Sequence, residues 1–383
     1  MLNTAYARID LTALEGNLKV VRSLCPGSRV MAMVKADAYG HGLLRVAEVL
    51  SSADGMAVAR LHEALLLREA GIKVRILLLA TLLDSVDLAT CSEMDIDVTA
   101  HDPTSVACIA DQARRTPLRV WLKLDSGMHR NGLSSDAFIE ADRVLSRHPG
   151  ILELTHMTHF SSATNPASPV TDRQMLEFCL CHSASSEAKV SLANSAALIS
   201  RCDLQADWVR PGIMLYGDNP LGPNHPIRMR AVMTLSSRII AVRQIDSGES
   251  VGYDGSWSSD RVSRVATVGI GYGDGYPRHA RNGTPVWING QLSRLAGRVS
   301  MDSLTIDVTE CGHVLVGDEV ILWGPDLPVS AVAQYADTIS YELLTSLSPR
   351  VTREYVSAAS GSVQAQTRVE LCTGRVPSEW RKE

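Results

Sequence analysis

Reactive or charged side chains stand at the ends of several apolar runs in this 383-residue chain. They are Lys35 at the end of "RVMAMVK", Arg130 after "RVWLKLD", His159 at the end of "LELTHMTH", Asn194 and Ser195 at the end of "KVSLAN", and Arg210 at the end of "ADWVR". If these runs are parallel strands of one barrel, their carboxyl ends meet at one mouth. The combined cations, imidazole, amide and hydroxyl would then bind an anion and transfer protons.

Lys35 has the most specific chemistry of this set. A single lysine is more often a surface residue whose stem covers apolar neighbours. At the end of a buried strand, however, desolvation disfavours the ammonium form, lowers the pKa and makes the amine nucleophilic. Such an amine suits covalent bonding to an aldehyde, either a substrate carbonyl or pyridoxal phosphate.

A phosphate group would need hydroxyl and backbone N–H donors near this amine. Ser195, at a predicted helix start, and "PGI" at 211–213 could supply them. Tyr39 and Tyr341 could add phenol donors, although a packing role fits each tyrosine equally well.

Eight predicted strands would position these residues. They are predicted at 29–35, 55–59, 74–80, 95–100, 119–125, 152–159, 189–194 and 206–210, mostly separated by amphipathic stretches of helical length. This pattern favours an α/β fold with an N-terminal (β/α)8 barrel of the TIM type. A doubly wound open sheet is the main alternative, but the glycine-rich turn after its first strand is missing.

Beyond Pro226 the chain is a series of short β-rich runs with turns at "DSG", "NG" and "GD". One helix, "SAVAQYADTISYELLTSL", is predicted among them. We therefore expect a barrel over 1–227, a β-rich domain over 228–356 and a polar tail over 357–383. The first strand, at about 4–9, could join the β-rich domain. Asp10 is predicted to cap the helix "LTALEGNLKVVRSL" that follows this strand.

Composition excludes several classes of function. The net charge of −5, with both signs interspersed, argues against binding nucleic acid. No apolar run is long enough for a membrane span, and "MLNTAYARID" is not a signal peptide. The eight scattered cysteines predict reduced thiols in the cytoplasm. Cys179 and Cys181 beside His182 could bind a metal, but a helical reading, with i and i+2 facing apart, is preferred, and no metal site is predicted.

At these residues the sequence closely resembles the alanine racemases. The matching segments are "VKADAYGHG", "KLDSGMHRNG", "THF", "NSA", "WVRPGIMLYG", "VGYDGSW", "GYGDGYPR", "GRVSMDSLTIDV" and "ISYELL", which run in family order to about residue 356. The resemblance implies an isomerase of the barrel-plus-β-domain type that uses pyridoxal 5′-phosphate. It also implies a head-to-tail homodimer with shared active sites, and a role in making D-alanine as a peptidoglycan precursor.

The resemblance implies two catalytic bases on opposite faces of the substrate α-carbon. Lys35 would hold the cofactor covalently and then serve one face, and Tyr253 of the partner subunit would serve the other. Both side chains start near pKa 10 and need a lower pKa to work at neutral pH, from burial of the amine or from positive charge near either group. Arg210 would lie against the pyridine nitrogen, in a hydrogen-bonded line with His159. Because an arginine keeps its proton, the ring nitrogen would stay unprotonated and side reactions would be suppressed.

The remaining implied roles concern the cofactor and the substrate. Arg130 would steady the cofactor's phenolic oxygen and the substrate carboxylate, held in place by Lys123, which is carbamylated in some relatives. The other expected cofactor-binding residues are Tyr39, Asn194, Ser195, Gly212, Ile213 and Tyr341. The backbone of Met301 would bind the carboxylate, and the narrow opening of the site would be lined by Tyr272, Tyr341, Arg278, Arg298 and Asp302.

Two positions depart from the family pattern. Thr164 stands where relatives usually have an acidic residue at the opening, and Ser300 replaces a residue that is cysteine in some of them. Thr164 leaves the breadth of substrates open, so a racemase for serine or other small amino acids is an alternative. A decarboxylase of the same fold is less favoured, since the chain has no GGG run and has Ser300-Met301-Asp302 in place of a cysteine and an acidic residue. A non-catalytic binding protein would require Tyr253 to be merely structural.

Overall fold

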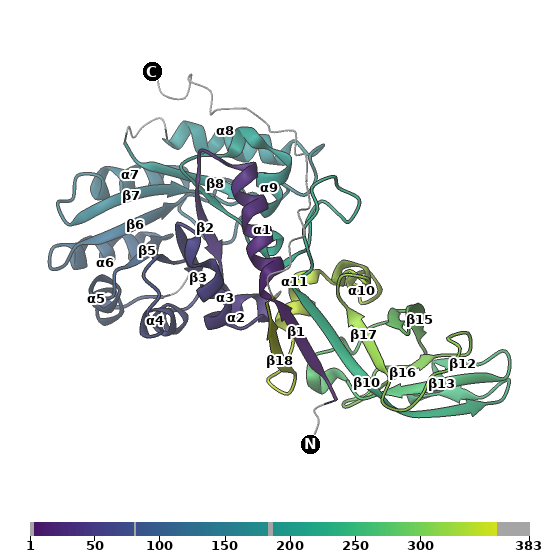
Figure 1. Cartoon of the computed structure of the whole chain (residues 1–383). Coiled ribbons are helices and arrows are strands. Elements are labelled where there is room, and N and C mark those ends of the chain that lie inside the picture. Colours follow the sequence, from purple (N-terminus) through teal and green to yellow (C-terminus); the bar gives the residue numbers. More distant parts are fainter. Residues whose placement is uncertain (1–3, 80–81, 183–186, 358–383) are drawn as a thin grey trace.

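The computed structural model describes residues 4–79, 82–182 and 187–357. A barrel surrounded by helices forms one part of the molecule, and a β-rich unit extends from its side (Figure 1). Of the tail predicted over 357–383, all but Ser357 lies outside the described residues.

Eight parallel strands close the barrel in sequence order. They are β2 (Arg29–Met33), β3 (Gly55–Val58), β4 (Arg75–Leu78), β5 (Ile96–Ala100), β6 (Leu118–Lys123), β7 (Ile151–Met157), β8 (Lys189–Asn194) and β9 (Trp208–Arg210). Each corresponds to one of the predicted runs, so the TIM-type barrel is confirmed and the doubly wound sheet is excluded. All eight carboxyl ends therefore meet at one mouth.

Helices connect these strands around the outside of the barrel. They are α1 (Leu11–Leu24), α2 (Lys35–Gly40), α3 (Leu43–Val49), η1 (Leu50–Ser52), α4 (Leu61–Glu69), α5 (Ser85–Glu93), α6 (Pro103–Ala113), α7 (Ser135–Leu145), α8 (Val170–His182), α9 (Ser195–Ser200), η2 (Cys202–Leu204) and η3 (Ile213–Tyr216). In α1 the predicted cap is confirmed, because the Asp10 carboxylate accepts the Ala13 N–H at 2.8 Å. Its buried face includes Leu14, Leu18 and Val21.

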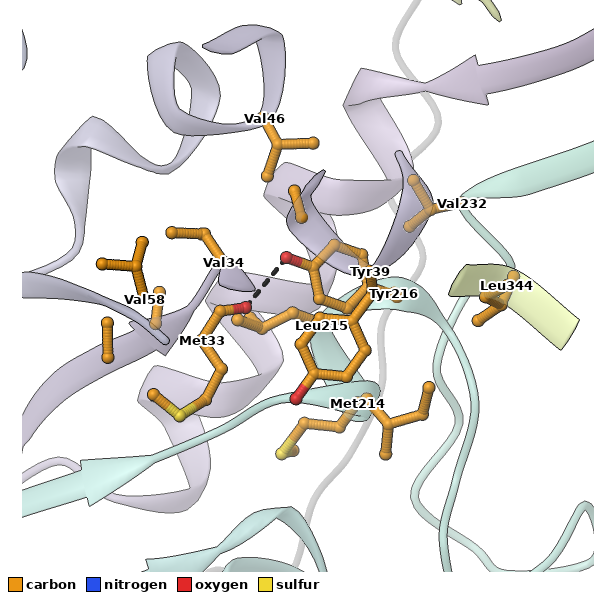
Figure 2. Close-up of a cluster of buried hydrophobic side chains, with 14 of the residues drawn as sticks. Met33, Val34, Tyr39, Val46, Val58, Met214, Leu215, Tyr216, Val232 and Leu344 are labelled. Carbon is orange, nitrogen blue, oxygen red and sulfur yellow. Dashed lines mark hydrogen bonds between the residues drawn. The ribbon is translucent and has the colours of Figure 1, made fainter. Parts of the chain in front are cut away.

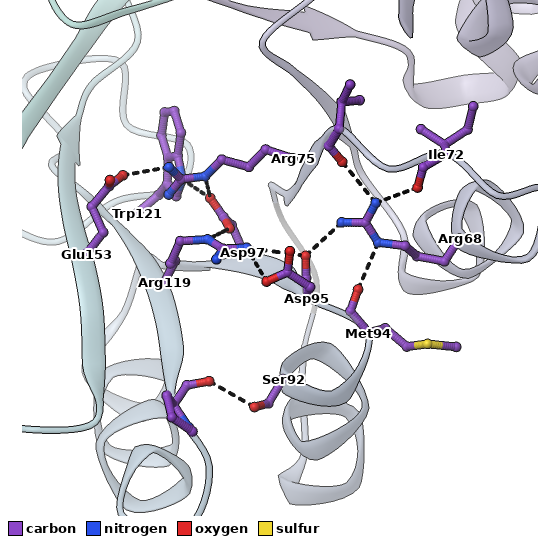
Figure 3. Close-up of polar contacts among 12 residues, drawn as sticks. Arg68, Ile72, Arg75, Ser92, Met94, Asp95, Asp97, Arg119, Trp121 and Glu153 are labelled. Atoms are coloured by element: carbon purple, nitrogen blue, oxygen red, sulfur yellow. Dashed lines mark hydrogen bonds and ion pairs between the residues drawn. The ribbon is translucent and has the colours of Figure 1, made fainter.

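A charged network fills the barrel at the end opposite the mouth (Figure 3). Asp97 is fully buried and accepts hydrogen bonds from Arg119 Nε at 2.7 Å and Trp121 Nε1 at 2.8 Å. It also pairs with Arg75, whose guanidinium lies 2.7 Å from Glu153. Because each ion belongs to a different strand among β4 to β7, a slip in register would leave a buried charge unpaired.

The second unit is an eight-stranded sheet in the order β13-β16-β15-β14-β17-β10-β1-β18. Its strands are β1 (Tyr6–Asp10), β10 (Met233–Ile245), β13 (Ser263–Val268), β14 (Pro285–Ile288), β15 (Gln291–Leu295), β16 (Leu304–Asp307), β17 (Glu319–Trp323) and β18 (Thr352–Val356). The first strand pairs here with β10 and β18. A separate pair, β11 (Ser250–Val251) with β12 (Trp257–Ser258), flanks the short helix η4 (Tyr253–Gly255).

The prediction of a single helix near the end of the β-rich unit is wrong. The structure has two helices, α10 (Val329–Tyr335) and α11 (Ser340–Thr345). Asp337 between them has a φ of 47°, and Ile339 is extended before α11 begins. A left-handed residue directly after a helix ends it, which helical periodicity alone does not reveal.

The two units meet in an apolar cluster beside the mouth, with Met33 and Tyr39 on one side and Leu344 of α11 opposite (Figure 2). The Tyr216 hydroxyl donates to the Met33 carbonyl at 2.9 Å. The Tyr39 and Tyr216 rings stack with centroids 4.6 Å apart. The β-rich unit therefore supports the segment that follows Lys35.

Neither a membrane span nor a metal cluster is found in the described ranges. Every helix there is too short or too polar to cross a bilayer. The described residues include no group of three or more His, Cys, Asp and Glu side chains arranged to hold a metal ion. Cys179 and Cys181 lie on α8, as the helical interpretation predicted.

Candidate active site

Lys35 begins a turn of left-handed helix. The φ angles of Ala36 and Tyr39, its first and last residues, are 55° and 54°, and those of the two residues between them are both 53°. For residues other than glycine this conformation costs roughly 1–2 kcal/mol each. The turn therefore depends on contacts with its surroundings.

Two glycines after this turn permit close packing against the β-rich unit. A Cβ on Gly40 would lie 2.0 Å from the Leu344 carbonyl oxygen, and one on Gly42 would lie 1.9 Å from the Tyr355 hydroxyl. Both have positive φ, at 79° and 93°. The glycines of "AYGHG" thus let the chain turn away directly beneath α11 and β18.

The half-buried Lys35 amine lies in an electropositive setting. Burial is the main cause that lowers its pKa, the charge of Arg130 lowers it further, and Glu63 raises it. Burial, Arg130 and Arg210 lower the pKa of Lys123 to about 8. Both amines thus hold their protons less tightly than exposed lysines do.

Every cation at the barrel mouth lowers the pKa of His159. Burial lowers its pKa to about 3, and Arg210, Arg130, Lys123 and Lys35 contribute in the same direction. Its imidazole is therefore neutral at physiological pH. Side chains from four strand ends, as expected from the sequence, lie within electrostatic range of one another.

Arg210 is buried, and both terminal nitrogens of its guanidinium donate to the barrel. Its guanidinium donates to the carbonyl and hydroxyl oxygens of Ser191 at 2.8 and 2.6 Å and to the Thr158 and Leu192 carbonyls at 2.6 and 3.2 Å. None of these four hydrogen bonds joins Arg210 to His159, so the line expected between them stays a prediction. Burial lowers the pKa of Arg210 to about 10, so the guanidinium remains charged at neutral pH.

Arg130 stands in an exposed loop that Asp125 organises. One carboxylate oxygen of Asp125 accepts the N–H groups of Gly127, Met128 and His129 at 3.0, 3.0 and 2.9 Å. A Cβ on Gly132 would lie 2.5 Å from the Asp125 nitrogen. The sequence analysis missed Asp125, although an aspartate followed by "SG" is a turn signal.

Hydroxyl and backbone donors converge beside the Lys35 turn. The Gly212 N–H donates to Ser195 Oγ at 2.8 Å, and a Cβ on Gly212 would lie 2.5 Å from the Tyr39 hydroxyl. Ile213 begins η3 directly after Gly212. The Tyr39 and Tyr341 rings are 6.0 Å apart, and burial raises the pKa of both, so they remain phenol donors. This set can bind a phosphate ester next to an amine.

Asn194 lies beside these hydroxyl and backbone donors but has a structural role. Its side-chain oxygen accepts the Ala197 N–H at 3.0 Å and caps α9, and its amide nitrogen donates to the Phe160 carbonyl at 3.4 Å. It thereby fixes the helix start that carries Ser195.

Tyr253 is not brought to Lys35 within one chain. It is 63% exposed on η4, at the end of the β-rich unit away from the barrel (Figure 1, by β12). The adjacent Asp254 pairs with Arg298 at 3.3 Å. This exposure fits a residue that works against another surface.

The other β-domain residues form a group around η5 (Tyr272–Asp274). Tyr272 donates its N–H to the Ser300 carbonyl at 3.0 Å, and its ring lies 6.0 Å from the Arg278 guanidinium. Met301 is exposed, and Asp302 pairs with Arg350 at 2.7 Å. Thr164 is exposed in the loop after β7.

The comparisons with known proteins agree with this geometry. The family model described as the alanine racemase N-terminal domain matches residues 9–220, and the one described as the alanine racemase C-terminal domain matches 232–355. The chain belongs to the alanine racemase family. The division predicted at 227/228 falls between the two matches.

Individual relatives match over nearly their whole length. The chain is 45% identical over 350 residues to the alanine racemase of Shewanella woodyi, covering 90% of this chain and 97% of that one. It is 46% identical over 367 residues to that of Chromohalobacter salexigens, covering 94% and 100%.

Solved structures show the same architecture. The biosynthetic alanine racemase of Pseudomonas aeruginosa superposes with a TM-score of 0.89 at 39% identity, over 93% of this chain and all of that one. That of Bartonella henselae, described with covalently bound pyridoxal phosphate, gives 0.85 at 30% identity over 92% and 99%. Family membership makes this chain an isomerase and disfavours the decarboxylase and binding-protein readings.

Proposed function

We propose that this chain interconverts L-alanine and D-alanine with pyridoxal 5′-phosphate, as a cytoplasmic homodimer with shared active sites. The observation that carries the proposal is the setting of Lys35. Its amine, with a lowered pKa, lies beside donors suited to phosphate and cations suited to a carboxylate. Six of the described cysteines, Cys25, Cys91, Cys108, Cys179, Cys181 and Cys311, are free thiols, which supports a cytoplasmic location.

The residues present fit this cofactor. Lys35 provides the amine that bonds its aldehyde. Gly212, where a Cβ would collide with the Tyr39 hydroxyl, lets that hydroxyl approach the segment that carries Ile213. The hydroxyls of Tyr39 and Ser195 and the backbone of Ile213 would hold the phosphate. Tyr341 would add a further phenol, and Arg210 would present its permanent charge to the ring nitrogen.

When bound, pyridoxal phosphate supplies an electron sink that acidifies the α-hydrogen of an attached amino acid. Racemisation removes this proton from one face and returns a proton to the other, so two groups are required. Lys35 holds or accepts the proton at Nζ on one face, and Tyr253 of the partner subunit does so at Oη on the other. Arg210 keeps the ring nitrogen unprotonated, and neutral His159 lies beside it.

The substrate carboxylate is assigned to Arg130 and to the backbone of the partner subunit's Met301. Tyr272 and Asp302 line the opening of the site. Because a methylene changes discrimination by only about 1–3 kcal/mol, pocket size sets the preference for alanine over larger amino acids.

A racemisation assay over single enantiomers of alanine, serine and other small amino acids, with pyridoxal phosphate present, tests the proposal. We expect conversion of alanine in both directions and loss of activity in Lys35→Ala. Tyr253→Phe should lower turnover by about 10²–10⁴-fold, the usual contribution of a positioned acid or base. Tyr335→Phe, at another tyrosine of the β-rich unit, should remain active. Inactivity of the parent protein on alanine, or full activity of Tyr253→Phe, would reject the assignment.

A further inference from the structure

We propose that Glu63 is the positioning residue for Lys35. Its carboxylate fixes the peptide that follows Lys35 and places a negative charge beside the amine. The inference rests on the proposed function, because it takes Lys35 to be the lysine that bonds the cofactor.

The contacts of Glu63 join two neighbouring strand ends of the barrel. The residue is buried at the start of α4, with 6% of its surface exposed. Oε2 accepts the N–H groups of Ala59 and Arg60 at 2.9 and 3.0 Å, just after β3. Oε1 accepts the Ala36 N–H at 2.7 Å, just after β2. Donors alone surround both oxygens in these contacts, which suits a carboxylate.

Helix capping explains only half of this arrangement. A glutamate at the third position of a helix commonly reaches back to the N-cap N–H, as Oε2 does to Arg60. The bond from Oε1 crosses to another strand and holds the first residue after Lys35. It therefore restrains the direction in which the Lys35 side chain leaves the strand.

The left-handed turn has other restraints. The Ala38 N–H donates to the Val34 carbonyl at 2.9 Å across Lys35, and further contacts act farther along. Arg353 Nε donates to the Gly40 carbonyl at 2.8 Å, and Asp37 Oδ1 accepts the Leu43 N–H at 2.7 Å. His41 Nδ1 lies 2.8 Å from the Tyr39 carbonyl. None of these contacts engages the Ala36 N–H, which donates to Glu63.

The charge of Glu63 also opposes the other influences on Lys35. Burial and Arg130 lower the pKa of the amine, whereas Glu63 raises it. Lys123 and His159 face the same amine from β6 and from the end of β7. Removing the negative charge should therefore make the Lys35 amine neutral at a lower pH.

The test compares Glu63→Gln with Asp54→Asn in the full-length protein. Asp54 is a matched control because its carboxylate accepts the Val30 N–H at 2.8 Å, the same kind of bond at the opposite end of β2. After removal of the cofactor, acylation of Lys35 is followed by mass spectrometry across pH. We expect the labelling midpoint to fall by about one pH unit in Glu63→Gln and to stay unchanged in Asp54→Asn.

A second readout follows release of pyridoxal phosphate from the loaded protein by its visible absorbance. Release should be about tenfold faster in Glu63→Gln, because a hydrogen bond to a charged group is lost. Glu63→Asp keeps the charge but is too short to span both strand ends. The Glu63→Asp variant should keep the parental labelling midpoint and still release the cofactor faster. If Glu63→Gln does not fold, the release rate of Glu63→Asp tests the positioning role.

The outcomes separate the two proposals. If the parent protein does not bond pyridoxal phosphate at Lys35, the proposed function fails. If the parent does, but both Glu63 variants match Asp54→Asn in release rate, or Glu63→Gln keeps the parental labelling midpoint, the positioning role is overturned.

Discussion

At the scale of single residues, several cations lie close together at the barrel mouth. Their mutual repulsion would be stronger in a less polar protein interior. Lys35, Lys123, Arg130 and Arg210 influence one another's charge, as the lowered pKa values of the two lysines show. Such an excess of positive charge suits a doubly charged phosphate ester and a substrate carboxylate. It also lowers the pKa of the Lys35 amine, and it gives Lys123, with a pKa of about 8, a neutral, nucleophilic fraction near neutral pH.

Lys123 allows a direct test of this electrostatic setting. Because its pKa is lowered to about 8, half of the amine should be neutral and open to acylation near that pH. Labelling followed by mass spectrometry should give a midpoint near pH 8 for Lys123, with the exposed Lys19 as the comparison site. A midpoint at the ordinary lysine value of about 10.4 would contradict the burial and the neighbouring charges described for Lys123. A neutral amine is also the form that carbamylation requires.

At the scale of elements, the left-handed turn α2 depends on a buried neutral histidine. His41 is completely buried, and burial lowers its pKa to about 4 from an ordinary value of 6.5. As the pH falls below 6.5, the unfolded chain therefore binds a proton before the folded one. Protonation of His41 therefore lowers the free energy of unfolding progressively as the pH falls from about 6.5 to 4. Above that window His41 does not change it.

His41→Asn should remove this pH dependence while keeping a donor for the Tyr39 carbonyl. We expect the loss of unfolding free energy between pH 8 and pH 5 to be smaller by about 2 kcal/mol than in the parent. Urea unfolding at the two pH values measures the difference. His313→Asn, at an exposed histidine, should leave it unchanged, and an equal acid loss in parent and His41→Asn would contradict the assignment.

The ionic network at the end of the barrel opposite the mouth has a different role, because it joins strands to one another and binds no reactant. Asp97→Asn would remove the fully buried carboxylate that Arg75 and Arg119 share, leaving them Glu153 and Asp95 as carboxylate partners. Breaking a buried ion pair typically costs about 3–5 kcal/mol. Asp111→Asn, which breaks an exposed pair with Arg115, should change stability by less than about 1 kcal/mol. Denaturant unfolding compares the two. Equal effects would mean that the buried network does not secure the barrel.

At the scale of the whole molecule, the proposed reaction needs two chains. Lys35 lies at the barrel mouth, whereas Tyr253 is exposed on the outer part of the β-rich unit. A head-to-tail dimer would present each Tyr253 to the barrel of the other subunit. The two catalytic groups would then never come from the same chain.

Mixing two inactive variants tests this arrangement. In a dimer of Lys35→Ala with Tyr253→Phe, one of the two sites has both native residues, and random exchange makes half of all dimers mixed. Co-refolded subunits should therefore regain about a quarter of the parental activity. Each variant refolded alone is the control. If both groups came from one chain, the mixture would stay inactive.

The sequence by itself was sufficient for the barrel and for the side chains at its mouth. Each apolar run became one strand, and strand ends in a closed parallel barrel meet whatever the loops do. Lys35, His159 and Arg210 could thus be grouped without knowing any distance. This information is local, because hydrophobic periodicity and the residue that ends a run are readable within a few positions.

Tertiary structure alone decided how these side chains are held. The left-handed turn after Lys35 has no residue pattern that demands it, since Ala36 and Ala38 ordinarily favour right-handed helix. It exists because Glu63, Arg353 and α11, all distant in sequence, bond to it or pack against it. The break between α10 and α11 and the hydrogen bonds that engage Arg210 also follow from packing. Contacts between remote segments stabilise conformations that local preference disfavours, and local sequence patterns do not reveal which remote segments will meet.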